Sequence, residues 1–184
     1  MSEQAIVINN HGNFEKDFLQ KIVSGVTQEF LLPVTIEESH MDITEFYDPM
    51  RRQYDGNRIL KELDSHSSSP HLKKIGLFRV DLCIPILTYI FGQAPLNGKT
   101  GIASLYRLRN EQYGMKKDES LLLDRFEKVT IHELGHLFGL VHCHVPPCVM
   151  RSSTYVEDLD QKSQNLCKKC RTEIHSAMLG QYLT

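Results

Sequence analysis

The segment from His132 to His142 carries residue types at spacings suited to holding a metal ion. His132 and His136 lie four residues apart, so on a helix their imidazoles project from the same face and can share one ion. Glu133 follows His132 directly, which is a poor place for a further ligand but a suitable one for taking the proton of a zinc-bound water. The spacing favours a hydrolytic zinc centre over the plainer alternative of two unrelated histidines on a helix surface.

His142 lies six residues beyond His136, where a continuing helix would carry it away from a shared ion. Gly139 lies between them and predicts a bend, because glycine adopts the left-handed conformation that commonly ends a helix. The bend would return His142 to the metal, and three imidazoles leave the fourth position of zinc open. We therefore expect a catalytic zinc at His132, His136 and His142, with Glu133 as the general base.

Four of the five cysteines form a second pattern, a C-x4-C pair and a C-x2-C pair separated by 18 residues: Cys143, Cys148, Cys167 and Cys170. This spacing is typical of a structural zinc site with four thiolates, whose negative charge nearby cations such as Lys162 and Arg171 would offset. Disulfides are the alternative, and they require an oxidising compartment. The N-terminal residues have neither the basic region nor the long apolar core of an export signal, so we expect reduced thiols in a cytoplasmic protein.

The string from His132 to Cys170 reads H-E-x-x-H-x-x-G-x-x-H-C-x4-C-x-Met followed by C-x-x-C, and it resembles the signature of the archaemetzincins, a branch of the metzincin metalloproteases. The resemblance implies that Met150 lies in a tight turn beneath the zinc. It also implies a strand, placed here at 102–108, whose exposed edge pairs with an extended substrate. Several metzincins have a tyrosine two residues after this methionine, whereas this chain has Ser152 there, so no tyrosine is assigned to the chemistry.

The chain has 184 residues, 41% of them apolar, and a net charge of -2, which fits one domain with a substantial core. The absence of a basic excess argues against a nucleic-acid partner, and no apolar stretch reaches the length of a membrane span. We expect a peptide substrate as the partner, and the sequence predicts no oligomeric state.

Hydrophobic periodicity predicts an alternation of strands and helices. The resemblance implies an α/β fold of the α+β metzincin type, with a small twisted mixed sheet and helices that include the zinc-binding one. Strands are expected at 5–8, 32–36, 75–84 and 102–108, and helices at 14–30, 58–63 with Asn57 as N-cap, 119–138 and 164–178. Residues 1–184 would form a single catalytic domain. Its N-terminal part, 1–139, would carry the sheet and the active-site helix, and its C-terminal part, 140–184, would be a cysteine-rich subdomain stabilised by zinc.

These patterns together predict a zinc-dependent peptidase acting on short or unfolded peptides, with one catalytic and one structural zinc per chain. A zinc-stabilised peptide-binding module with an idle or masked hydrolytic centre is the alternative, because no inhibitory pro-segment is recognisable and residues 180–184 offer a possible covering tail. Hydrolysis of peptides by the zinc-loaded protein discriminates between the two.

Overall fold

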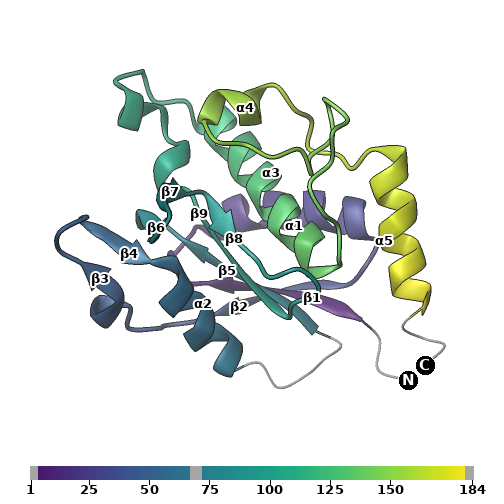
Figure 1. The fold of residues 1–184 in the computed structure, drawn as a ribbon, viewed down its shortest axis with the longest axis horizontal. Coiled ribbons are helices and arrows are strands. Elements are labelled where there is room, and N and C mark those ends of the chain that lie inside the picture. Colours follow the sequence, from purple (N-terminus) through teal and green to yellow (C-terminus); the bar gives the residue numbers. More distant parts are fainter. Residues whose placement is uncertain (1–3, 67–71, 181–184) are drawn as a thin grey trace.

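A computed structural model describes residues 4–66 and 72–180 and places a five-stranded sheet at the centre (Figure 1). The strand order is β2 (Val34–Glu38), β1 (Ala5–Asn10), β5 (Leu72–Phe78), β9 (Thr100–Ser104) and β8 (Gly92–Gln93). The first four strands are parallel, whereas β8 runs antiparallel to β9 and ends the sheet. A second sheet has the order β3 (Tyr47–Asp48), β4 (Gln53–Asp55), β6 (Leu82–Ile84) and β7 (Leu87–Ile90).

The helices cover both faces of the central sheet. On one face lie α1 (Lys16–Phe30) and α3 (Glu119–Leu137), which pack against each other, and on the other lies α2 (Gly56–Ser65). Two short elements, α4 (Val156–Asp160) and α5 (Lys168–Gly180), follow α3, and three 3-10 turns lie at Thr44–Phe46, Tyr106–Leu108 and Asn110–Tyr113. The predicted mixed α/β class is thus confirmed.

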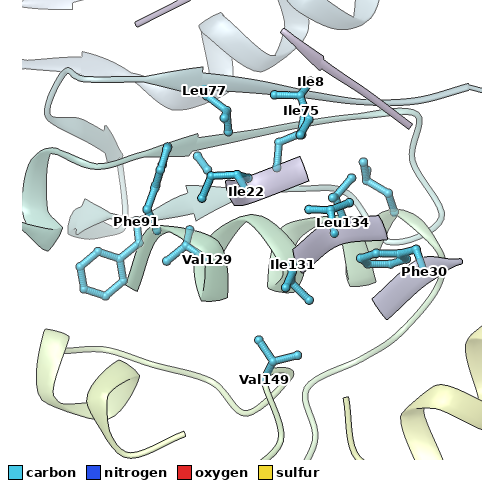
Figure 2. Packing of buried hydrophobic residues seen from close by; sticks show 14 of the residues in the cluster. Ile8, Ile22, Phe30, Ile75, Leu77, Phe91, Val129, Ile131, Leu134 and Val149 are labelled. Carbon is cyan, nitrogen blue, oxygen red and sulfur yellow. The ribbon is translucent and has the colours of Figure 1, made fainter. Parts of the chain in front are cut away.

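Strand β5 shows how alternation builds the two cores. Ile75 and Leu77 face α1 and α3, whereas Phe78 packs with the residues of α2 on the opposite face, as expected for side chains of period two. Figure 2 shows Ile75 and Leu77 on one side of α3 and Val149, from the C-terminal segment, on the other. Helix α3 is therefore enclosed on two sides, and its residues 125–135 are all buried.

Two predictions of element boundaries are wrong: one continuous strand was expected where there are two, and the N-cap of α2 was assigned to the wrong residue. The strand expected at 75–84 is two strands, since the chain leaves the central sheet after Phe78 and enters the second sheet at Leu82. The N-cap of α2 is Asp55 rather than Asn57, because the Asp55 carboxylate accepts hydrogen bonds from the backbone amides of Asn57 at 2.9 Å and Arg58 at 3.3 Å.

The prediction of an edge strand at 102–108 is also wrong. Strand β9 stops at Ser104 and lies inside the sheet between β5 and β8, and residues 106–108 form a 3-10 turn. The edge is β8, only two residues long. Within 4–66 and 72–180 no helix has the length and apolarity to cross a bilayer. Most of the tail expected at 180–184 lies outside the described residues.

Glu127 of α3 is a carboxyl group buried between helices. It is 9% exposed and lies against Gly25 of α1, with no hydrogen bond or ion pair to any of the residues that the structure describes. Burial raises the pKa of Glu127 to about 7, and the neighbouring Asp124 carboxylate acts in the same direction. The folded chain consequently retains a proton on Glu127 at a pH where the unfolded chain has released it.

Glu127→Gln is expected to raise the free energy of unfolding by about 1–2 kcal/mol more at pH 8 than at pH 5. A raised folded pKa means that the wild-type chain loses stability as the pH rises from the ordinary glutamate value through about 7, and the neutral amide does not. Urea unfolding across this pH range measures the difference. The exposed Glu111→Gln is the control, and a stability difference for Glu127→Gln that does not change with pH would contradict the assignment.

Candidate metal centre

Helix α3 places His132 and His136 on one face, with ring centroids 4.7 Å apart. The helix begins behind the cap Asp118, whose carboxylate accepts from the Leu121 amide at 2.9 Å, and ends at Leu137. Gly139 then adopts a φ of 92°, as its predicted role in the bend requires, and its amide donates to the carbonyl of His136 at 2.9 Å.

His142 returns to the histidine pair after this bend. Its ring centroid lies 5.3 Å from that of His132 and 5.0 Å from that of His136, and one nitrogen from each of the three rings lies within 4.8 Å of the others. Burial lowers the pKa of all three histidines, most strongly for the fully enclosed His132. The set therefore favours neutral imidazole, the form that binds metals.

The orientation of two rings is fixed by backbone carbonyls. The Nδ1 atom of His132 donates to the carbonyl of Val149 at 2.9 Å, and Nδ1 of His136 donates to that of Leu140 at 2.7 Å. Both Nε2 atoms are then acceptors, yet they face each other 3.1 Å apart. Two lone pairs directed at one another repel unless a cation lies between them, so this donor set fits a divalent metal.

Glu133 lies beside this group at the edge of the central sheet. It is 7% exposed, and a Cβ atom added at Gly92 of β8 would lie 2.7 Å from Cγ and 3.0 Å from Cδ of Glu133. The absent side chain of Gly92 thus leaves room for the carboxyl group next to the edge strand. Burial raises the pKa of Glu133 to about 8, and the ammonium of Lys162 opposes this shift. A divalent cation at the imidazoles would also favour the carboxylate form.

The turn that contains Met150 packs directly beneath the histidine pair. Met150 is fully buried, and its thioether occupies the space that a side chain at Gly135 would fill. The Cys143 amide donates to the Met150 carbonyl at 3.0 Å, which joins this turn to the segment carrying His142. The close approach explains why a glycine stands inside α3 despite its helix cost of about 1 kcal/mol.

The four predicted cysteines gather into one cluster in which all thiols are free. The Sγ atoms of Cys143 and Cys167 lie 3.8 Å apart, as do those of Cys148 and Cys170, and all four lie within 4.8 Å of one another. A disulfide requires about 2.05 Å. Four sulfurs placed tetrahedrally about 2.3 Å from one zinc ion lie about 3.8 Å apart, so the cluster fits a closed metal site.

A cleft of about 450 Å³ opens in front of the histidines and Glu133. Residues 87–94 of β7 and β8 form one wall, and residues 152–155 after the Met150 turn form the other. The Tyr89 hydroxyl donates to the Thr154 carbonyl at 3.1 Å and so connects the two walls. The sequence interpretation gave Tyr89 no role, because neither its spacing nor its neighbours relate it to a histidine 43 residues away.

Lys162 was expected to neutralise the thiolates, but the structure places it on the cleft. Its Nζ donates to the carbonyls of Val149 at 2.9 Å and Arg151 at 2.6 Å, and burial lowers the pKa of Lys162 to about 8. Arg171, also expected near the thiolates, instead pairs with Glu29 of α1 at 3.0 Å. Lys162 still acts electrostatically on Cys148, as expected, whereas Arg171 was misplaced because proximity in sequence was taken for proximity in space.

The chain is similar to known proteins over most of its length. Residues 5–176 match peptidase family M54. The archaemetzincin of Saccharolobus solfataricus is 34% identical over 186 residues, covering 100% of this chain and 98% of the relative, and that of Pyrococcus abyssi is 35% identical over 170 residues, covering 90% of each. The crystal structure of a zinc-dependent peptidase from Methanocorpusculum labreanum has a TM-score of 0.83 at 29% identity and covers 92% of this chain and 99% of that chain.

The crystal structure of the archaemetzincin from Methanopyrus kandleri has a TM-score of 0.82 at 27% identity and covers 96% of both chains. Sequence, fold and the two candidate metal sites therefore agree: the chain belongs to the archaemetzincins, the zinc metallopeptidases of family M54.

Proposed function

We propose that this chain hydrolyses peptide bonds of short or unfolded peptides at a zinc ion held by His132, His136 and His142, with Glu133 as the general base. The observation that carries the proposal is the pair of Nε2 atoms that face each other while both Nδ1 atoms donate to carbonyls. Zinc bound there supplies polarisation of the substrate carbonyl and a lowered pKa for the attacking water.

Glu133 performs the proton transfers in this proposal. Its carboxylate accepts a proton from the attacking water and then donates it to the leaving amine. The position of Glu133 beside Gly92 of β8 supports this role, because a substrate strand paired with β8 passes next to the carboxyl group. Among residues 4–66 and 72–180 no strand pairs with the outer edge of β8, which favours pairing of its backbone groups with an extended peptide.

The second zinc is proposed at Cys143, Cys148, Cys167 and Cys170, as a structural ion without an open position. Residues 1–184 act as one catalytic domain in this proposal, with the active-site helix in 1–139 and the third histidine and the cysteines in 140–184. A cytoplasmic location is consistent with it, because a reducing compartment keeps metal-binding thiols reduced.

The preference for short or unfolded peptides is supported by the shape of the cleft. The hydrogen bond between Tyr89 and Thr154 spans the two walls and narrows the cleft, which favours a single extended segment over a folded protein surface. The cleft would therefore select substrates by their extended conformation, independently of their side chains.

Glu133→Ala is expected to retain the fold and both metals while losing about two to four orders of magnitude in kcat. Removal of the base leaves the three imidazoles and their carbonyl partners in place. Cleavage of a fluorogenic peptide, metal content and circular dichroism are measured on the same preparation. Glu157→Ala, an exposed position outside the cleft, is the control. Full turnover by the Glu133→Ala variant would place the base elsewhere.

Metal analysis is expected to give about two zinc ions per chain in two classes. A chelator should remove the histidine-bound ion readily and the four-sulfur ion slowly, because only the first has an open position. His136→Ala should lose the labile ion alone, and Cys167→Ser should lose the resistant ion together with thermal stability. A single class of zinc, or loss of the labile ion in neither variant, would disprove the two-site assignment.

Tyr89→Phe is expected to raise kcat/KM for a long unfolded polypeptide about two- to tenfold relative to a short peptide of the same cleavage sequence. The variant removes only the hydroxyl that joins the walls of the cleft. Tyr106→Phe is the matched control, because the Tyr106 ring contacts the same Arg107 but its hydroxyl makes no such bridge. An unchanged ratio of the two rates would show that this contact does not restrict the substrate.

A further inference from the structure

Lys162 is a buried lysine next to the candidate catalytic centre whose ammonium forms no ion pair with any carboxylate of residues 4–66 and 72–180. It is 5% exposed, and Nζ donates to two backbone carbonyls, those of Val149 at 2.9 Å and Arg151 at 2.6 Å. Glu133 and Cys148 act on the ammonium electrostatically without a direct contact, so its burial costs free energy that a contact ion pair would offset. An apolar side chain of similar length would avoid that cost, so the lysine has a specific task.

The task is indicated by what else the Val149 carbonyl binds. The same oxygen accepts from Nδ1 of His132 at 2.9 Å, so Lys162 and His132 share one acceptor. The second carbonyl, of Arg151, lies on the other side of Met150, whose thioether packs against Gly135 of α3. The ammonium thus fixes both ends of the three-residue turn that supports His132.

We propose that Lys162 is a positioning residue for the zinc site: its ammonium holds the turn 149–151 so that the Val149 carbonyl keeps His132 in the Nδ1–H tautomer, with Nε2 directed at the metal. This inference rests on the proposed function, in which His132 is a zinc ligand. Lys162 lines the cleft and acts electrostatically on Glu133, but the proposed effect on His132 is transmitted by its hydrogen bond to the Val149 carbonyl. The expected consequence of its loss is an imidazole that is rotated or in the Nε2–H tautomer, which weakens zinc binding before it affects substrate binding.

Lys128 offers an internal comparison. It is also buried, at 4% exposure, and its Nζ also donates to a backbone carbonyl, that of Leu159 at 3.0 Å. Unlike Lys162, it has a carboxylate partner, Asp124, and the carbonyl that it binds accepts no hydrogen bond from a proposed zinc ligand. A buried lysine with a purely structural role should therefore behave like Lys128.

The test compares Lys162→Met with Lys128→Met in the full-length chain. Lys162→Met should bind zinc at the histidine site about 10- to 100-fold more weakly in competition with a chromophoric chelator. It should lower kcat more than it changes KM, and in the metal-free chain the ring nitrogen signals of His132 in 15N NMR should no longer report the Nδ1–H form alone. Lys128→Met should lower the melting temperature and leave zinc affinity and the His132 signals unchanged.

Lys162→Arg keeps a cation with several donors and should retain zinc affinity to within a few-fold of the wild type, which also provides a folded variant if the methionine variant does not fold. Wild-type zinc affinity and tautomer in Lys162→Met would overturn the proposal, as would equal losses of affinity in both methionine variants. The NMR and chelator measurements need no turnover. A wrong assignment of Glu133 as the base, detected by the activity of Glu133→Ala, is therefore distinguishable from a wrong role for Lys162.

Discussion

The site depends on one constraint: two backbone carbonyls must lie behind the histidines of α3 so that their Nε2 atoms point forward. The carbonyls belong to Leu140 and Val149, and neither lies on the helix itself. The chain must therefore approach α3 again at two places after the helix ends, at Leu140 and at Val149. Gly139 permits the first turn through its positive φ, and the absent side chain of Gly135 lets the second turn approach α3 closely. Replacing either glycine would displace a carbonyl before it displaced a histidine.

The C-terminal segment adds no strand to either sheet of the described residues, and it is held in this position by apolar packing onto the main core together with charged groups. The carboxylate of Glu29 on α1 accepts from Arg171 at 3.0 Å and from the Leu166 amide at 2.9 Å. Arg125 of α3 binds Asp160 at 2.6 and 2.7 Å. One partner of each pair, Glu29 or Arg125, is buried, so removing the more exposed partner would leave a buried charge without its counter-ion. These contacts help to fix the position of the C-terminal segment relative to α1 and α3, because hydrogen bonds and ion pairs are more directional than apolar packing.

The features that could be predicted from the sequence are those whose cause is local. The spacing of His132 and His136, the bend at Gly139 and the cysteine pairs each depend on residues within one or two turns of chain, and the structure brings all of them together. The edge strand could not be found in this way. Residues 102 and 103 face opposite cores and are both fully buried, so their alternation does not distinguish an inner strand from an edge, and β8 is too short to show any period.

Lys162 and Tyr89 escaped prediction for a related reason. Each acts by donating to a backbone carbonyl, of Val149 and of Thr154 respectively, and a carbonyl has no signature in the sequence. A candidate metal ligand can be recognised in the sequence by its residue type. The backbone carbonyls that orient it can be identified only from the three-dimensional structure of the turn. The sequence thus identifies the reacting groups of this centre better than it identifies their support.

The adjacency of His142 and Cys143 gives the second cluster a role beyond stability. Within the described residues, neither ring nitrogen of His142 has a hydrogen-bond partner, and His142 is the most exposed of the three histidines. Its position therefore depends on the backbone that follows, which is held by the Cys143 amide bonded to Met150 and by the Cys143 thiol in the cysteine cluster. A metal ion that orders the four sulfurs orders this backbone as well. In the proposed two-zinc protein, the free energy of metal binding at the four cysteines would therefore also contribute to placing the imidazole of His142.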